Sequence, residues 1–237
     1  MEKPTVCVWG DSLAKGVYFD EARGRYAILK DHCLRLLARE AGFDVRCDAV
    51  MGRTAPECLS AIHREERIAG ALAVFEFGGN DSDMDWAAVA REPDRDHPAR
   101  VSLPAFKAAL VGLAEFARRG GMQPVFTVPL PLDGDRYFHW VSKGLDADAI
   151  LRYLGGDPHM MYRWQEQYAG AVRDAARMCD VPVLDLRGAM LGDRHFRDYY
   201  CLDGIHLNEK GHRKLCEYIL KTWEEGQPIS DSGGMAC

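Results

Sequence analysis

The chain has 237 residues, of which 47% are hydrophobic and 28% are charged, and its formal net charge is −6. This composition is typical of a globular protein, and the length suits one large domain that needs neither a disulfide nor a structural metal to hold its core. Interspersed charges without a basic stripe exclude a typical nucleic-acid binder, and no run reaches the ~20 apolar residues of a membrane span. The first residues also lack the apolar run of a signal peptide, so we expect a cytoplasmic protein.

Short apolar runs alternate with helical patterns along the chain. The runs predict strands over Thr5–Trp9, Phe43–Val50, Ala71–Phe77, Pro124–Val128 and Val181–Leu186. Apolar residues at helical spacing predict helices over Tyr26–Ala41, Ala55–Ile68, about 106–113, Met161–Cys179 and about Asn208–Trp223. This alternation indicates βαβ units, and hence an α/β fold with a mainly parallel sheet covered by helices.

Two long segments interrupt the alternation. Asp83–His97 is an acidic loop, and Pro129–His159 is an insertion that carries several aromatic residues. Long ordered insertions often form lids or binding loops. We therefore expect a single domain over residues 1–226 with a lid-like insertion at about 129–159. Residues 227–237, which are small and polar, are expected to be a flexible tail.

The eight cysteines are scattered and include no C-x-x-C pair. Free cysteine behaves as a small buried hydrophobe, so we expect reduced thiols that fill the core.

The first motif directly follows the first predicted strand, in the sequence Gly10-Asp11-Ser12-Leu13. In open α/β sheets, ligands bind at the carboxyl ends of the strands. A serine at that position becomes a nucleophile when a base accepts its proton. The same four residues can also serve as an ordinary strand-to-helix turn.

Two further motifs follow the second and third strands. Gly78-Gly79-Asn80-Asp81 offers a close backbone approach and an uncharged amide donor, which suits an oxyanion. Gly52 could supply another backbone N–H at the end of the second strand. Each of these motifs alone is also compatible with a simple turn.

The last motif, Asp203-Gly204-Ile205-His206, places a carboxylate and an imidazole on one loop near the end of the chain. A catalytic histidine needs a partner that fixes its tautomer and stabilises its charged form, and Asp203 could provide this for His206. The same pair could instead bind a metal, although the thiols lack ligand spacing.

Taken together and in this order, the four motifs closely resemble those of the SGNH hydrolases, also called the GDSL esterase/lipase family. The resemblance extends from the first strand to the final helix and leaves the insertion outside the common core. In the second motif, Val50-Met51 replaces the asparagine that often precedes the glycine. The resemblance implies a three-layer α/β/α sandwich with a five-stranded parallel sheet, of flavodoxin-like topology.

The resemblance also implies acyl transfer to serine without a cofactor or metal. Ser12 would be the nucleophile, His206 the general base and then the general acid, and Asp203 the residue that orients His206. The oxyanion would be held by the backbone N–H groups of Ser12 and Gly52 and by the side chain of Asn80. Two further residues, Asp11 and Asp81, would support the site.

We expect a small-molecule ester as substrate, with short-chain acyl groups such as acetyl on carbohydrate favoured over lipids. Two other functions stay open. One is metal-assisted hydrolysis through Asp11, Asp81, Asp203 and His206. The other is a flavodoxin-like module that binds phosphate or a nucleotide, although neither G-x-x-x-x-G-K-[ST] nor G-x-G-x-x-G occurs in the sequence.

Overall fold

The protein is built around a five-stranded parallel sheet with strand order β4-β1-β5-β6-β7. The computed structural model describes residues 5–62 and 71–225, so the expected tail 227–237 and the end of the helix expected over Ala55–Ile68 lie outside the described residues. The strands are β1 Thr5–Gly10, β4 Asp44–Ala49, β5 Leu72–Glu76, β6 Gln123–Thr127 and β7 Val183–Leu184. Each lies within or overlaps a predicted apolar run.

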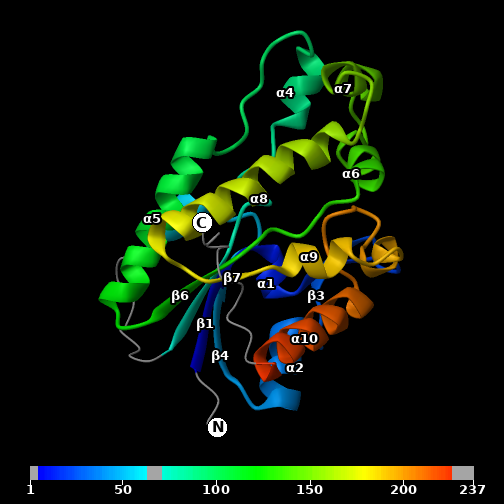
Figure 1. Cartoon of the computed structure of the whole chain (residues 1–237). Helices are drawn as coiled ribbons and strands as arrows, with labels where there is room; N and C mark the ends of the chain where they lie inside the picture. The colour runs from blue at the N-terminus through cyan, green and yellow to red at the C-terminus, as the bar shows by residue number, and fades with distance from the viewer. Residues whose placement is uncertain (1–4, 63–70, 226–237) are drawn as a thin grey trace.

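The helices surround this sheet, and Figure 1 shows their arrangement. They are α1 Ser12–Lys15, α2 Cys33–Ala41, α3 Ala55–Ala61, α4 Trp86–Arg91, α5 Leu103–Arg119, α6 Gly134–Val141, α7 Ala147–Tyr153, α8 Met160–Cys179, α9 Leu186–Leu191 and α10 Glu209–Glu224, with a short 3-10 helix, η2, over Phe196–Tyr199. Several begin at an Asp, Asn or Ser whose side chain accepts a backbone N–H of the first turn. Such caps satisfy donors that would otherwise have no partner inside the helix.

The two faces of the sheet belong to two separate cores. On β5, Ala73 and Phe75 join a core that also contains residues of α3, α5 and α8. Their neighbours Leu72 and Val74 pack instead with residues of α2, α9 and α10. Successive side chains of a strand point to opposite faces, so this division follows from the strand geometry. The result is the predicted three-layer α/β/α sandwich, and the prediction of the fold is confirmed.

A β-hairpin precedes α2 and was not predicted. Strands β2 Val17–Asp20 and β3 Arg25–Ile28 pair in an antiparallel register. The helix predicted over Tyr26–Ala41 is therefore wrong in its first part, because α2 begins only at Cys33. Phe19 and Tyr26 face each other across the two strands with ring centroids 5.5 Å apart. This long-range pairing takes residues 25–28 away from the helical pattern that follows them.

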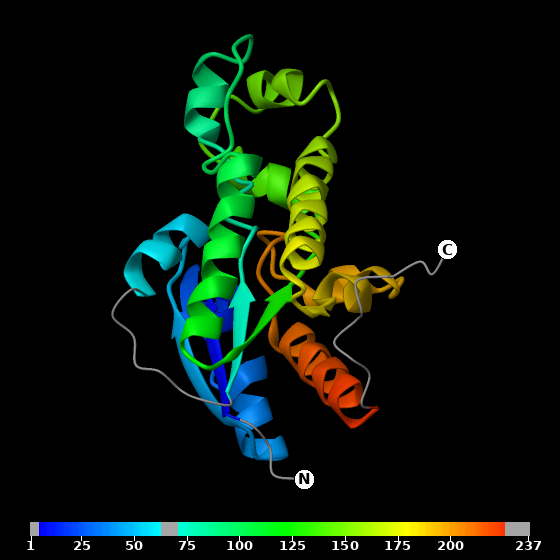
Figure 2. The ribbon, with the colours of Figure 1, turned by 60° about the vertical axis from the view of Figure 1, so that its left-hand side comes forward.

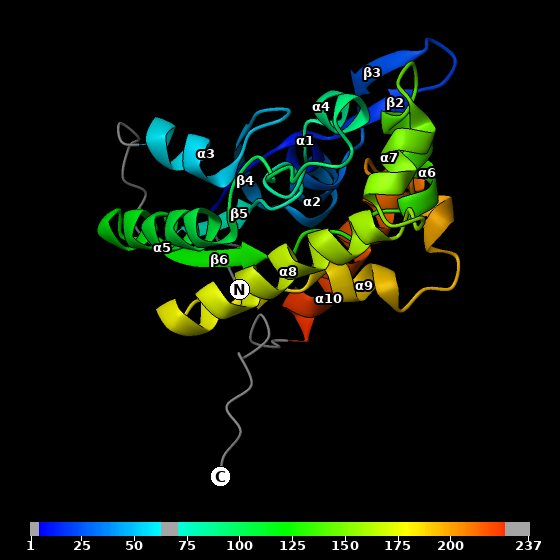
Figure 3. The same cartoon turned by 90° about the horizontal axis from the view of Figure 1, so that it is seen from above.

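The two interrupting segments contain helices. The acidic loop predicted over Asp83–His97 includes α4, and the Pro129–His159 insertion folds into α6 and α7. Helices α4 and α7 lie together at the top of Figures 1 and 2. Seen from above, α6 and α7 lie near the β2–β3 hairpin (Figure 3). These segments share a third apolar cluster, which includes Trp86, Leu132, Tyr137 and Ile150.

Among the helices of the described residues, none has the combination of length and apolar character that crossing a bilayer requires.

Candidate active site

Ser12 lies just beyond the carboxyl end of strand β1, which is placed between β4 and β5 in the sheet, and it is the first residue of α1. Asp11 caps α1, and its Oδ1 accepts the backbone N–H of Leu13 at 3.0 Å. Glycine is needed at position 10, because a Cβ there would lie 2.9 Å from Oε2 of Glu76 and 2.8 Å from Cβ of Ala14. The absence of a side chain at Gly10 allows the backbone to turn closely past Glu76 and Ala14. This turn places Ser12 at the carboxyl-terminal end of the strands.

Ser12, His206 and Asp203 form a continuous hydrogen-bonded chain. Nε2 of His206 lies 2.9 Å from Oγ of Ser12, and its Nδ1 lies 2.7 Å from Oδ2 of Asp203. Asp203 is fully buried and His206 is only 5% exposed. The imidazole is thus positioned to accept the serine proton on one nitrogen while the other faces a carboxylate, which is the relation that an activated serine requires.

The loop that carries Asp203 and His206 is held from both sides. The backbone N–H of Cys201 donates to the carbonyl of His206 at 2.8 Å, and Asp133 at the start of α6 donates its N–H to the carbonyl of Gly204 at 2.9 Å. Gly204 has φ +74°, and a Cβ there would lie only 2.7 Å from the carbonyl oxygen of Asp133. Only glycine allows this close approach in this backbone conformation.

Every lone-pair direction of the Asp203 carboxylate meets a donor. Oδ1 accepts the backbone N–H groups of Ile205 at 3.1 Å and His206 at 3.0 Å. Oδ2 accepts the phenol of Tyr26 at 3.1 Å in addition to the imidazole. Burial alone would raise the pKa of Asp203, but the hydrogen bonds and charge of His206 outweigh it, so the pKa is lowered. Asp203 is therefore ionised at neutral pH.

Asn80, in the loop that follows β5, reaches the same site through Asp11. Its Nδ2 donates to Oδ2 of Asp11 at 2.7 Å, and this bond fixes the amide with its second N–H free to donate elsewhere. Asn80 and Ser12 both line the cleft described below. This arrangement suits an amide that would donate to a developing oxyanion.

Gly52 lies on the neighbouring loop after β4. That loop is joined to the end of β1 by a hydrogen bond from the N–H of Val50 to the carbonyl of Gly10, at 3.2 Å. Gly52 has φ +81°, and its carbonyl accepts Nη2 of Arg100 at 3.1 Å. Gly52 is not among the described residues that line the cleft, so the structure places its loop, but not its N–H, beside Ser12.

Asp81 does not face the cleft. It is fully buried, and its two oxygens accept the backbone N–H groups of Ala55 at 2.9 Å and Gly78 at 3.0 Å. Burial raises the pKa of Asp81 to about 7, although these two donors oppose the shift. The residue joins the start of α3 to the end of β5, and thereby ties together the loops that carry Gly52 and Asn80.

Glu76 is a second buried carboxyl beside Asp11. In the sequence, Glu76 is noticeable only as a carboxylate within the apolar run ALAVFEF. The sequence alone does not tell whether its side chain is buried. It is 6% exposed, and its Oε2 accepts the N–H of Asp11 at 3.2 Å. Burial, reinforced by the negative charge of Asp11, raises the pKa of Glu76 well above its ordinary value. Burial also raises the pKa of Asp11. The pair lies directly beneath the turn that holds Ser12.

The cleft next to Ser12 and His206 is small and has aromatic walls. Its volume is about 90 Å³, and its walls come from α4, α6, α8, the segment 129–132 and the loop of His206. The apolar residues that line it are Leu13, Trp86, Leu130, Leu132, Tyr137, Met161, Trp164 and Ile205. Asp83 orders two of these rings, since its Oδ1 accepts the indole N–H of Trp86 at 2.8 Å and the phenol of Tyr137 at 2.6 Å.

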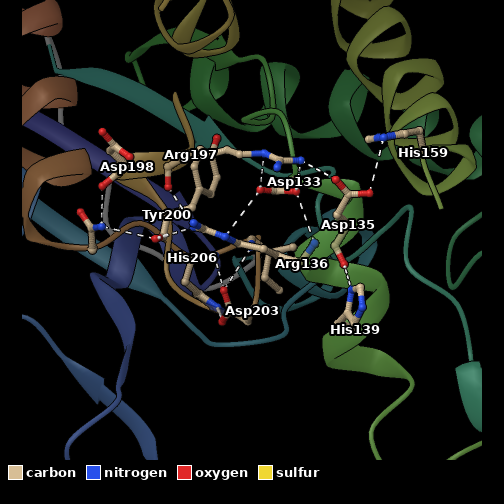
Figure 4. A network of polar contacts seen from close by, with 12 residues as sticks. Asp133, Asp135, Arg136, His139, His159, Arg197, Asp198, Tyr200, Asp203 and His206 are labelled. Atoms are coloured by element: carbon tan, nitrogen blue, oxygen red, sulfur yellow. Dashed lines mark hydrogen bonds and ion pairs between the residues drawn. The ribbon is translucent and has the colours of Figure 1, made fainter. Parts of the chain in front are cut away.

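A network of charged residues connects the insertion to the loop of His206 (Figure 4). The carboxylate of Asp133 is buried, and its Oδ2 lies 3.0 Å from Nε of Arg197. Nη1 of Arg136 donates to the carbonyls of Arg197 at 2.9 Å and Tyr200 at 3.2 Å. The start of α6 is therefore held against the segment that leads to Asp203.

The described part of the chain contains no group of three or more His, Cys, Asp or Glu side chains arranged to hold a metal ion. Both oxygens of Asp81 accept backbone N–H groups, and the Asp203 carboxylate accepts four protein donors. The four residues of the metal-assisted hypothesis do not converge on one point.

Comparison with known proteins gives a family and a set of similar structures. Residues 8–214 match the model of the GDSL-like lipase/acylhydrolase family. No curated protein matches the sequence significantly. The lipase/acylhydrolase from Enterococcus faecalis is similar in structure, with a TM-score of 0.66 and 18% identity over 96% of this chain and 99% of that chain.

Two further structures share the fold at low identity. A GDSL-like lipase from Bacteroides thetaiotaomicron has a TM-score of 0.59 and 15% identity, over 95% of this chain and 93% of its own. The psychrotrophic esterase EstA from a Pseudoalteromonas species has a TM-score of 0.59 and 12% identity, over 94% of this chain and 98% of its own. Because the family model covers most of the sequence, the chain belongs to the GDSL-like lipase/acylhydrolase family and is a carboxylic ester hydrolase.

Proposed function

We propose that this hydrolase cleaves short-chain esters, in particular acetyl esters of carbohydrates or other small molecules, with Ser12, His206 and Asp203 as its catalytic triad. The observation that carries the proposal is the hydrogen-bonded chain from Ser12 through His206 to Asp203, with contacts of 2.9 and 2.7 Å. A serine in such a chain is activated for attack on an acyl carbon.

The reaction uses only groups of the chain and water. His206 takes the Oγ proton of Ser12 as the oxygen attacks the ester carbonyl carbon, and Asp203 stabilises the imidazolium that forms. The imidazolium then protonates the leaving alcohol. In the second half, His206 takes a proton from water, the hydroxide attacks the acyl-enzyme, and Ser12 leaves with the proton restored. None of these steps requires a cofactor.

The negative charge of each tetrahedral intermediate needs fixed donors. We assign this role to the backbone N–H groups of Ser12 and Gly52 and to Nδ2 of Asn80, with Asp11 holding the Asn80 amide through its 2.7 Å hydrogen bond. Asp81 would act at a distance by fixing the two loops that carry Gly52 and Asn80. Each such donor contributes roughly 3–4 kcal/mol to lowering the barrier.

The size and lining of the cleft support a small acyl group. A volume of about 90 Å³ leaves little room for a long alkyl chain. Aromatic walls such as Trp86 and Trp164 suit the apolar face of a sugar ring as well as a methyl group. Within the single domain expected over residues 1–226, the segment at about 129–159 would act as the lid that closes over the acyl group, since Leu132 and Tyr137 already line the cleft.

A serine-directed phosphonate tests the nucleophile. The Pseudoalteromonas esterase was crystallised in a form inhibited by monoethylphosphonate, which makes this reagent class suitable. We expect one phosphonyl group per chain on the peptide that contains Ser12, and none on the Ser12→Ala variant. That variant should lose ~10⁴-fold or more in kcat/KM on p-nitrophenyl acetate.

Ser82 provides the control because it lines the same cleft, where its Oγ donates to the carbonyl of Gly79 at 2.9 Å. The Ser82→Ala variant should still be labelled at Ser12. Labelling of Ser82, or full activity of Ser12→Ala, would show that the nucleophile has been assigned to the wrong residue.

A substrate series tests the acyl preference separately. We expect kcat/KM to fall as the acyl chain of p-nitrophenyl esters lengthens, and acetylated sugars to be deacetylated. A rate that rises with chain length beyond about eight carbons would contradict the short-chain preference. Such a rise would mean that a pocket accommodates each added methylene and gains binding energy from it.

A further inference from the structure

We infer that Tyr26, a residue of the β2–β3 hairpin, is a positioning residue that holds the Asp203–His206 pair in its working geometry by donating its phenol proton to Asp203. The inference rests on the proposed triad and extends it by a fourth member. The hairpin lies outside the central sheet, and no motif of the sequence points to it.

The first observation is a shared oxygen. Oη of Tyr26 lies 3.1 Å from Oδ2 of Asp203, and the same oxygen receives Nδ1 of His206 at 2.7 Å. The other oxygen, Oδ1, already accepts two backbone N–H groups. The phenol is therefore the fourth donor of a buried carboxylate, and without it one lone pair of that carboxylate would lose its partner.

The second observation is that Tyr26 contacts the imidazole directly. The two ring centroids are 5.1 Å apart and the ring planes are inclined by 58°. One side chain thus limits the rotation of the His206 ring and also donates a hydrogen bond to the carboxylate partner of that ring. Burial and the nearby charge of Asp203 raise the pKa of Tyr26, so the phenol keeps its proton and acts as a donor throughout the working pH range.

The third observation is that Tyr26 is itself fixed by two aromatic rings. Phe19 faces it from β2 at 5.5 Å, and Trp140 of α6 lies 6.1 Å away. Phe19 and Trp140 contact each other at 4.7 Å. The phenol is held in place by packing from the hairpin and from the insertion, as expected for a side chain that orients another group.

The physical effect can be predicted with its sign. A neutral donor on Asp203 spreads the charge of the carboxylate and weakens its hold on the imidazolium proton. Without the phenol, Asp203 would stabilise the charged imidazole more strongly, and activity on the acidic side should be lost at a higher pH. Loss of the hydrogen bond that holds the Asp203–His206 pair would lower kcat while leaving binding of the ester nearly intact.

Removal of the Tyr26 phenol leaves the other ionisable groups near Asp203 and His206 unchanged. They come from the loop of His206 itself (Cys201), from the cap of α1 (Asp11), from α10 (His212), from α6 (Asp133 and Arg136, which pack on Gly204) and from the hairpin (Tyr18, beside Cys201). A change confined to the phenol of Tyr26 therefore reports on Asp203 and His206.

The experiment compares Tyr26→Phe with Tyr18→Phe, the two phenols of the same hairpin. The phenol of Tyr18 bonds Asp20 at 3.4 Å and does not reach the triad. For Tyr26→Phe we expect a fall of roughly tenfold in kcat on p-nitrophenyl acetate with little change in KM, since a hydrogen bond to a charged group has been removed. The acidic limb of its kcat/KM profile should move upward by about half a pH unit. Tyr18→Phe should match the parent enzyme in both respects.

The low-field proton NMR signal of the Nδ1–H of His206 gives a readout that does not depend on turnover. It should shift in Tyr26→Phe and stay in place in Tyr18→Phe. If the profile and the signal of Tyr26→Phe coincide with those of the parent enzyme, Tyr26 only fills space and the inference is overturned. If Ser12→Ala is fully active, the triad itself is wrong, and that failure is recognised independently.

Discussion

Asn80 makes one hydrogen bond with the protein and is expected to make another with the reacting ester. Its Nδ2 donates to Asp11 at 2.7 Å, which leaves the second amide proton for the oxyanion. Because the oxyanion exists only during the reaction, this second bond should affect the rate of the chemical step and not the binding of the substrate.

We therefore expect Asn80→Ala to lower kcat by about 10²–10³-fold with KM nearly unchanged. Steady-state kinetics on p-nitrophenyl acetate, with a thermal melt to exclude unfolding, checks this. Asn80→Asp serves as a comparison, since it keeps the size of the side chain but replaces the donor with a negative charge, and it should be equally slow. A higher KM at an unchanged kcat would assign Asn80 to ground-state binding.

At the scale of elements, the insertion and the loop of His206 are joined at Asp133. Its N–H bonds Gly204, and its buried carboxylate forms an ion pair with Arg197 at 3.0 Å (Figure 4). The helix α6 that begins here also supplies Trp140, which packs on Tyr26. Disturbing Asp133 should therefore affect both the stability of the fold and the geometry of His206.

Asp133→Ala should lower the free energy of unfolding by about 2 kcal/mol, below the roughly 3–5 kcal/mol for a fully buried pair, because the Arg197 left behind reaches water. Arg197 is 50% exposed on its side chain, which is the reason for the smaller figure. The variant should also lose kcat. Urea denaturation followed by tryptophan fluorescence measures the first effect.

A matched control is Asp94→Ala, which breaks the exposed ion pair with Arg152 at the outer end of the same region. It should change stability by less than about 0.5 kcal/mol. Equal losses in the two variants would mean that Asp133 contributes no more than a surface charge.

At the scale of the whole molecule, the buried carboxyls with raised pKa values, Asp11, Glu76 and Asp81, should shape the dependence of stability on pH. An unfolded glutamate loses its proton near pH 4.3, whereas folded Glu76 keeps it to a higher pH. The folded state thus binds more protons, and Glu76 lowers the free energy of unfolding as pH rises from about 4.3 through its folded pKa. Glu76→Gln removes this contribution.

The stability of Glu76→Gln relative to the parent protein should therefore increase as pH rises from about 4.5 to 8, as followed by urea denaturation at several pH values. Glu57→Gln is the opposite case. The N–H of Thr54 lowers the pKa of Glu57, so its stabilisation is present above the unfolded pKa and is lost as pH falls. Parallel curves for the two variants would contradict the assignment of Glu76 as a carboxyl that burial keeps protonated.

The alternation of apolar runs and helical patterns was enough to predict the five strands of the sheet and, with shifted bounds, helices α2, α3, α5, α8 and α10, because each of these elements carries its own periodicity. It did not predict α4, α6, α7 or α9. The convergence of the motifs could also be predicted, since the ends of parallel strands lie at one edge. Ser12, Asn80 and the Asp203–His206 loop do meet there, while Gly52 is placed only through its loop.

What the sequence could not predict depends on pairing between distant residues. Leu29, Cys33, Leu36 and Leu37 share a helical spacing, which extended the expected helix back over residues that form β3. Tyr26 bonds a residue 177 positions away, and no local pattern marks such a contact. Likewise, the burial of Glu76 depends on Asp11, 65 positions earlier.

The proposed nucleophile and base are 194 positions apart, one on the turn that follows β1 and the other on the loop before α10. During synthesis, Ser12 would therefore leave the ribosome long before His206 is made, and the growing polypeptide could not hydrolyse esters until the segment that carries His206 had emerged. The same separation means that cleavage of the chain between α4 and α5 would give two fragments without esterase activity. Their reassembly could then be detected by the return of ester cleavage.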